Sequence, residues 1–233
     1  MAPPALCNGC NGMDERLRYI ATLVRRGSRV ADIGTDHAYL PVYLVQNGIC
    51  PCAIAGDVRL SPAENARKAV RQAGLEAQIQ VRVGDGLSVL QPKEADDIVI
   101  AGMGGENIAA ILQAAPWVRE PSLRLILQPM SHPEQMRAFL LQNGFSLLHE
   151  CTVASAGRRY AVAVAAFTDA PPQPAWRHYT GILDPCTERP FLQKQLAWVQ
   201  ARCRGLKQEN NEEYRQYDLL ARQIECYIDG GSV

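Results

Sequence analysis

Short apolar runs alternate with helix-length segments over most of the chain, and this alternation limits the possible folds more than any other feature. The runs are five or six residues long, and apolar residues recur at helical spacing between them. A strand, a helix and a second strand in that order form a right-handed crossover, which joins parallel strands. The pattern therefore predicts an α/β fold. The predicted strands cover residues 29–34, 52–57, 79–83, 97–101 and 123–127, and the predicted helices cover 38–47, 61–73, 104–114 and 133–143.

Two strand-like runs then follow each other without a helix between them. Residues 145–153 and 159–167 are separated by the turn-forming sequence Ala154-Ser-Ala-Gly157, which predicts a hairpin that closes one edge of the sheet. Adding this hairpin to the five crossover strands gives a mostly parallel, seven-stranded sheet of the Rossmann-like type. Ahead of the first strand, residues 13–26 predict a short amphipathic helix that begins at Asp14.

The C-terminal part of the chain differs in composition. Ala170-Pro-Pro-Gln-Pro174 predicts a stiff linker. Beyond it, two apolar stripes within residues 188–228 predict an antiparallel helical pair with a break near Gly205 or Asn210. We therefore divide the chain into a flexible tail at 1–12, a nucleotide-binding domain at 13–169, a linker at 170–187 and a C-terminal helical hairpin at 188–233.

The charge balance restricts the classes of partner. The chain has 24 basic and 24 acidic residues, so total charge gives no support to a nucleic-acid or membrane partner, and any such partner would have to bind a local patch. No apolar run approaches the roughly 18 residues that a membrane span needs. The N-terminus also lacks the features of a signal peptide, so we expect a cytoplasmic protein without membrane contact.

The eight cysteines are scattered along the chain, and we expect them to be reduced thiols. Cys7 and Cys10 form a C-x-x-C pair, and Cys50 and Cys52 form a C-x-C pair; together they could offer four thiolates to a metal ion. The first pair lies in a Gly- and Asn-rich tail without a fixed structural context. We therefore predict no metal site.

Polar groups and glycine follow the first predicted strand directly. In this segment Gly34 allows the backbone to approach a ligand closely, while Asp32, Asp36 and His37 bring polar side chains to the turn. The second and third glycines of a dinucleotide fingerprint are missing. A pyrophosphate would need those glycines and would be repelled by the carboxylates, whereas a sulfonium and an ammonium tolerate acidic surroundings. The segment therefore favours S-adenosylmethionine over NAD.

The next three strands end in residues of the same kind. Asp57 can accept hydrogen bonds from ribose hydroxyls, although NAD sites use the same device. A tight turn at Gly84-Asp85-Gly86 can present its carboxylate to an adenine amino group, and Ala101-Gly-Met-Gly-Gly105 has little side-chain bulk. Each feature alone has a structural explanation: glycines serve turns, Asp57 neighbours a helix, and Met103 is a core side chain. Four successive strand ends of this type favour a site.

Three segments resemble the bacterial tRNA (adenine-22-N1)-methyltransferase family. They are Val30-Ala-Asp-Ile-Gly-Thr-Asp-His-Ala-Tyr-Leu-Pro41, Ala101-Gly-Met-Gly-Gly105 and Leu127-Gln-Pro129. The likeness extends from the N-terminal helix to the hairpin near Phe167, and the C-terminal helices are similar to that family's coiled-coil extension. The resemblance implies a class I methyltransferase that transfers the methyl group of S-adenosylmethionine to N1 of adenine 22, in the D-loop region of tRNA. The cysteine-containing tail, Met130 and the helical region depart from the family's pattern.

The strand-end pattern and the resemblance together give a set of site residues. Asp36 occupies the position of the family's candidate catalytic carboxylate. The expected cofactor contacts are Asp32, Gly34, His37, Asp57, Gly84, Asp85, Gly86, Ala101, Gly102 and Met103. The expected substrate contacts are Tyr39, Pro41, Gly104, Gly105, Gln128 and Pro129.

The hypothesis for Asp36 is a hydrogen bond to the adenine N6 amino group that orients the ring and stabilises the positive charge left by methylation. The alternative is that Asp36 caps the following helix. The adenine must be unpaired or flipped outward, so the surrounding RNA must be held. Candidate phosphate contacts are Arg67, Lys68, Arg71, Arg158, Arg159, Arg202, Arg204 and Lys207, although solvated faces are the commoner explanation for such charges. Candidate base-stacking residues are Tyr39 and Tyr160, for which a structural role explains the tyrosines at least as well.

Other functions stay open at this point. The same fold serves methyltransferases that act on small molecules or on other RNAs. A second alternative is a non-catalytic nucleotide-binding scaffold whose helical pair contacts a protein. A NAD-dependent oxidoreductase is disfavoured because the full glycine fingerprint is missing.

Overall fold

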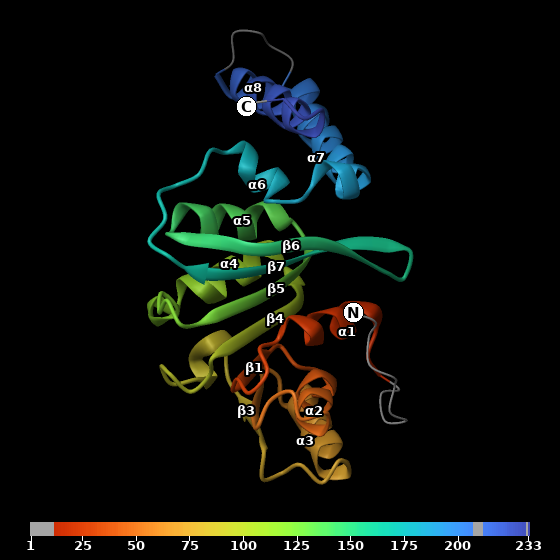
Figure 1. Ribbon diagram of the computed structural model, residues 1–233, viewed down its shortest axis with the longest axis vertical. Helices are drawn as coiled ribbons and strands as arrows, with labels where there is room; N and C mark the ends of the chain where they lie inside the picture. Colours follow the sequence, from red (N-terminus) through yellow and green to blue (C-terminus); the bar gives the residue numbers. More distant parts are fainter. Residues whose placement is uncertain (1–11, 207–211, 232) are drawn as a thin grey trace.

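The computed structural model describes residues 12–206, 212–231 and 233, which form a seven-stranded sheet with helices on both faces and a helical C-terminal region (Figure 1). The strands are β1 Val30–Ile33, β2 Ala53–Asp57, β3 Ile79–Val83, β4 Asp97–Gly104, β5 Arg124–Ser131, β6 Phe145–Ser155 and β7 Arg158–Phe167. The helices are α1 Glu15–Leu23, α2 Tyr39–Gln46, α3 Leu60–Gln72, α4 Gly105–Gln113, α5 Pro133–Gln142, α6 Trp176–Thr180, α7 Pro185–Gly205 and α8 Glu212–Ile228, with the 3-10 turns η1 Gly86–Val89 and η2 Pro116–Val118.

The sheet is mixed, which corrects the prediction of a mostly parallel sheet. Its strand order is β3-β2-β1-β4-β5-β7-β6. The pairings among β1 to β5 are parallel, whereas β5–β7 and β6–β7 are antiparallel. The predicted hairpin is confirmed, and its tight turn at Ala156 and Gly157, both with positive φ, can only join antiparallel strands. The returning strand β7 lies between β5 and β6.

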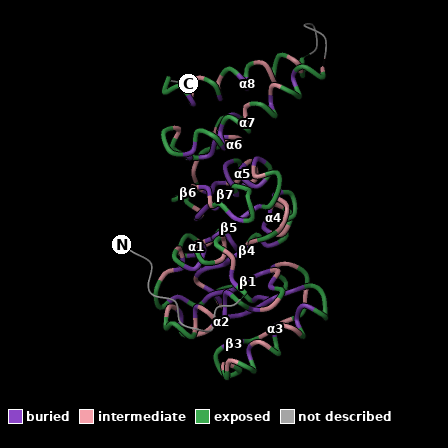
Figure 2. Tube along the Cα trace, turned by 90° about the vertical axis from the view of Figure 1, so that its right-hand side faces the viewer, coloured by how far each residue is buried: buried purple, intermediate pink, exposed green. Residues whose placement is uncertain are grey.

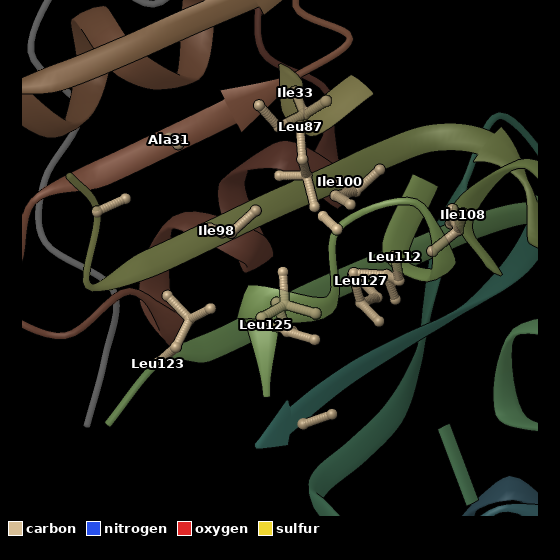
Figure 3. Close-up of a cluster of buried hydrophobic side chains, with 14 of the residues drawn as sticks. Ala31, Ile33, Leu87, Ile98, Ile100, Ile108, Leu112, Leu123, Leu125 and Leu127 are labelled. Carbon is tan, nitrogen blue, oxygen red and sulfur yellow. The ribbon is translucent and has the colours of Figure 1, made fainter. Parts of the chain in front are cut away.

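The central parallel strands β1, β2, β4 and β5 are buried on both faces, because helices cover each side. Along β4, Ile98 and Ile100 pack into one core and Val99 into the other. Leu125 and Leu127 of β5 point to the same side as Ile98, in the core drawn in Figure 3. Alternate residues of a strand face opposite sides of a sheet, so nearly continuous apolar runs are needed where both sides are covered.

Helix α1 begins as predicted. The side chain of Asp14 accepts a hydrogen bond from the backbone N–H of Leu17 at 3.0 Å and so caps the first turn. The predicted tail, with Cys7 and Cys10, lies outside the described residues apart from Gly12. None of the helices in the described ranges is long and apolar enough to cross a membrane.

The C-terminal helices form a separate layer at one end of the elongated molecule (Figures 1 and 2). Helices α7 and α8 share an apolar cluster with α6, in which Leu192, Val199 and Ile224 are fully buried. Part of the segment expected as a linker is therefore helical, since α6 lies within it and α7 already begins at Pro185. Asp184 caps α7 by accepting a hydrogen bond from the N–H of Cys186.

A buried ion pair joins this layer to the sheet domain. Arg137 of α5 and Glu150 of β6 are both inaccessible to solvent, and Nε donates to Oε1 over 2.7 Å. Arg137 also donates to the carbonyl of Tyr179, and Glu150 accepts from the N–H of Ile182. A side chain on Gly181 would collide with both charged groups. The connection between α6 and α7 is thus fixed on the pair.

A second carboxylate covers the outer edge of the sheet. Glu188, where α7 departs from helical geometry near Pro190, accepts hydrogen bonds from the N–H and the hydroxyl of Thr152 on β6. Arg159 of β7 donates to the same carboxylate. The edge strand is thereby bonded to α7.

We expect Arg137→Met to lower the free energy of unfolding by about 3–5 kcal/mol, because it leaves the Glu150 carboxylate buried without its partner. Urea denaturation followed by circular dichroism measures the change. Arg222→Met, which removes an exposed pair with Asp218 on α8, is the control and should cost less than about 1 kcal/mol. Equal losses in the two variants would contradict the structural role of the buried pair.

Candidate active site

The ends of four strands surround a cavity with a volume of about 690 Å³. The carboxyl ends of parallel strands meet at one edge of a sheet, and ligands of open α/β sheets bind there. Helix α4 and the turns η1 and η2 form the other side. Of the residues expected to contact a cofactor, eight line the cavity: Gly34, Asp57, Gly84, Asp85, Gly86, Ala101, Gly102 and Met103.

Glycine is needed at the end of β1 for two reasons. Gly34 has φ of +83°, and a Cβ there would lie 2.1 Å from Cε of Met103. The N–H groups of Gly34 and Thr35 both donate to the carbonyl of Gly56, at 2.7 and 3.0 Å. These bonds hold the loop against β2, so the backbone itself forms part of the cavity wall.

The end of β4 contains a bulge. Ala101 pairs with Gln128 and Met103 pairs with Pro129, so Gly102 is the additional residue in β4. Its φ of +80° is one that glycine adopts readily. Met103, beyond the bulge, lies against Gly34, lines the cavity and also packs on the core.

Two acidic residues line the cavity, and they differ in how far their side chains are buried and hydrogen-bonded. The Asp57 side chain is only 6% exposed, and its Oδ1 accepts the N–H of Arg59 at 2.8 Å. Asp57 therefore lies at the start of α3 and faces the cavity at the same time. Asp85 is exposed in the turn after β3. The cavity wall carries carboxylates at two strand ends, which suits a cationic ligand better than a pyrophosphate.

Asp32 lies behind this wall rather than in it. The residue is 7% exposed and does not line the cavity. Burial raises the pKa of the Asp32 carboxyl to about 6, a hydrogen bond from Thr35 opposes the increase, and the Asp57 charge adds to it. The folded protein at neutral pH therefore holds a carboxylate in surroundings that disfavour its charge.

Asp36 and His37 lie on the loop after β1, outside the cavity lining. The Asp36 side chain is 66% exposed, with Oδ2 at 3.3 Å from Nε2 of His37, and the His37 ring stacks on Tyr39 with centroids 5.0 Å apart. The capping position of α2 is held by Ala38, without any side-chain hydrogen bond. Asp36 therefore does not cap this helix, and the structural alternative for it is wrong.

The residues expected to contact substrate divide by accessibility. Tyr39 is exposed and Gly104 is partly exposed. Pro41 is buried in the first turn of α2, Gly105 is buried against the backbone of His132, and Gln128 is fully buried with its amide already bonded. These three are corrected to packing or supporting positions, because the chain itself occupies their contact surfaces. Pro129, although buried, lines a smaller cavity beside α7.

Several cavity residues were missed by the sequence analysis. Val58 and Arg59 follow β2, Asn107 and Ile111 lie one turn apart on α4, and Trp117 comes from η2. The signal for the α4 pair was present, since a helix that follows a glycine-rich strand end presents its first turns to the site. Trp117 had no such signal, because it comes from a connection between α4 and β5.

Comparison with known proteins places this geometry among methyltransferases. The family model described as a methyltransferase domain matches residues 13–163. The tRNA (adenine(22)-N(1))-methyltransferase of Bacillus subtilis is 42% identical over 153 residues, which cover 66% of this chain and 64%, less than two thirds, of that protein. The crystal structure of a B. subtilis tRNA methyltransferase for m1A22 matches with a TM-score of 0.77 and 34% identity, covering 92% of this chain and 96% of the other.

A second solved structure carries a ligand. A candidate tRNA (m1A22) methyltransferase of Streptococcus pneumoniae, in complex with S-adenosyl-L-methionine, matches with a TM-score of 0.77 and 31% identity, covering 93% of this chain and 100% of that one. The structural similarity extends to the C-terminal helices, because the aligned 93% of this chain is longer than the sheet domain alone.

We expect Gly34→Ala to weaken binding of S-adenosylhomocysteine at least about tenfold, because the added methyl group displaces Met103 into the cavity. Gly48→Ala is the matched control: its φ is also positive, at +62°, but a Cβ there has no neighbour within 4 Å. Both variants should lose about 1 kcal/mol of stability through backbone strain. Isothermal titration calorimetry measures affinity, and unchanged affinity in Gly34→Ala would show that Met103 does not shape the cavity.

Asp32→Asn should stabilise the protein at alkaline pH. The folded pKa of about 6 exceeds the unfolded value of 3.8, so the wild-type free energy of unfolding falls as the pH rises from about 4 to about 6. The variant lacks this loss and should gain up to about 3 kcal/mol at pH 8 and almost nothing at pH 4. Urea denaturation at the two pH values tests this, and a gain that does not depend on pH would contradict it.

Proposed function

Because this chain belongs to the bacterial tRNA (adenine(22)-N(1))-methyltransferase family, we propose that it transfers a methyl group from S-adenosylmethionine to N1 of adenine 22 in tRNA. The observation that carries the proposal is the cavity at the four strand ends, with Gly34 against Met103 on one side and Asp57 on the other. The catalytic domain is residues 13–169, and the compartment implied is the cytoplasm, where tRNA is found.

The residues of the cavity fit this cofactor. Its volume of about 690 Å³ lies within the range of small-molecule sites. The buried Asp57 carboxylate suits ribose hydroxyls, Asp85 suits an adenine amino group, and the glycines at 34 and 102 let the backbone approach the ligand closely. Asp32, behind the β1 loop, adds negative potential that favours the cofactor's cationic groups.

Methyl transfer to N1 depends more on how the two reactants are positioned than on general acid–base catalysis. When bound, S-adenosylmethionine supplies a methyl group on a sulfonium, so that attack by the adenine N1 lone pair forms the N–CH3 bond as the S–CH3 bond breaks and S-adenosylhomocysteine leaves. The protein holds the two reactants in line and excludes competing geometries. Asp36, exposed beside the strand ends, accepts a hydrogen bond from the adenine N6 amino group and stabilises the positive charge that develops on the ring.

The adenine must leave its place in the folded RNA, so other surfaces hold the tRNA. A smaller cavity of about 200 Å³ lies between the end of β5 and α7, where Lys194 and Trp198 face Pro129 and Met130. A cation and an aromatic ring on one face suit a phosphate and a base. Of the candidate phosphate contacts, Arg67, Lys68, Arg71, Arg158, Arg159, Arg202 and Arg204 are exposed, and Lys207 lies outside the described residues.

The two candidate stacking tyrosines differ. Tyr39 is 40% exposed and follows the Asp36 loop, so it is the residue placed to contact a base. Tyr160 is buried, and the guanidinium of Arg16 lies 5.4 Å from its ring centroid. Tyr160 therefore supports the protein interior. Contact of the C-terminal helices with RNA is preferred over contact with another protein, because α7 lines the smaller cavity at the end of β5.

Incubation with unmodified bulk tRNA and labelled S-adenosylmethionine, followed by nucleoside analysis, tests the proposal. The expected product is 1-methyladenosine at position 22. Another methylated nucleoside would replace the substrate assignment, transfer to small molecules alone would favour the alternative enzyme class, and absence of transfer with intact cofactor binding would favour a scaffold.

Asp36→Asn should lower the rate of tRNA methylation by at least about a hundredfold, because the neutral amide stabilises the charged ring poorly. The dissociation constant for S-adenosylhomocysteine should stay within about twofold of wild type, since Asp36 lies outside the cavity lining. Glu64→Gln, an exposed acid on α3, is the control and should leave both quantities unchanged. Near-normal turnover of Asp36→Asn would remove this residue from the mechanism.

A further inference from the structure

The bulge in β4 leaves one backbone group that the sheet cannot satisfy. Gly102 is the additional residue between two paired positions, so its N–H has no partner across the strand. Gly102 itself lines the large cavity. A backbone donor at such a position needs a fixed acceptor, or the local conformation is free to change.

The side chain of Gln128 supplies that acceptor. Its Oε1 lies 3.2 Å from the Gly102 nitrogen, and its Nε2 donates to the carbonyl of Pro129 at 2.9 Å. Gln128 is fully buried, so water does not compete for its amide. The orientation of one buried amide therefore holds the bulge.

Arg16, from the first turn of α1, fixes the orientation of this amide. Its Nη1 donates to Oε1 of Gln128 at 2.6 Å, a contact that selects the oxygen rather than the nitrogen at this position. Asp14 holds the guanidinium through Nε and Nη2 at 2.9 and 2.6 Å, and Tyr160 lies beneath it. The Arg16 side chain is only 16% exposed.

We propose that Arg16 is a positioning residue for the cofactor: through Gln128 it holds the Gly102 bulge in the shape that admits S-adenosylmethionine. The inference rests on the proposed function and extends it to the N-terminal helix, which does not line the cavity. Charge-assisted hydrogen bonds are stronger than neutral ones, which suits a contact that must select one amide orientation.

Calorimetric titration of S-adenosylhomocysteine into Arg16→Met, Gln128→Leu and the double variant tests this chain of contacts. Each single variant should bind about tenfold more weakly than wild type. The double variant should bind about as weakly as Gln128→Leu alone, because Arg16 acts through Gln128. Additive losses in affinity would overturn the proposal.

Two further variants separate positioning from folding. Arg18→Met removes an exposed arginine from the same helix and should bind the ligand like wild type. Arg16→Lys keeps the charge but cannot bridge Asp14 and Gln128, so it should lose affinity less than Arg16→Met; if Arg16→Met does not fold, wild-type affinity in a folded Arg16→Lys would overturn the proposal. In steady state, the KM for S-adenosylmethionine should rise in Arg16→Met while the KM for tRNA stays constant.

The results also distinguish this inference from the proposed function. A wild-type protein that does not bind S-adenosylhomocysteine would refute the proposed function itself. A wild-type protein that binds it, with Arg16→Met binding equally well, would refute only the role of Arg16.

Discussion

The parallel pairing of β1 to β5 is the constraint on which the rest of the molecule depends. Each crossover returns the chain to the same end of the sheet, so every strand finishes at one edge and every loop that follows a strand lies beside the others. Asp57, the Gly34 loop and the β4 bulge are far apart in sequence and close together in space for this reason. The parallel pairing of the strands thus determines where the cavity lies, and the loops supply the side chains that line it.

This dependence explains how much could be predicted from sequence. The spacing of the apolar residues predicted the helices and strands. Because the strands pair in parallel, most of the residues expected to contact a cofactor lie around one cavity. The order of the two hairpin strands in the sheet could not be derived in the same way, because apolar spacing does not say which of them lies beside β5. Gln128 was misassigned because its partner Arg16 is 112 positions away, and no local pattern reports such a contact.

Buried charge appears in two different settings in the molecule. Arg137 and Glu150 pair with each other, and their bonds to the backbone of Tyr179 and Ile182 connect the sheet domain to the C-terminal helices. Asp32 has no cation beside it among the groups that shift its pKa, and its neighbour Asp57 makes its ionisation harder. A buried carboxylate without a cationic partner lowers the stability of the ligand-free protein. Such a group is expected where a cationic ligand completes the site.

The hydrogen bonds from Thr152 to Glu188 have a consequence for solubility. A sheet with an antiparallel outer strand exposes a row of backbone donors and acceptors, and such a row can recruit a strand from another molecule. Here a carboxylate from α7 takes up an outward N–H of β6 and brings a helix across the edge. The C-terminal helices therefore protect the sheet from edge-to-edge aggregation. A chain that ended before α7 would expose the unpaired backbone groups of β6, even if its sheet folded normally.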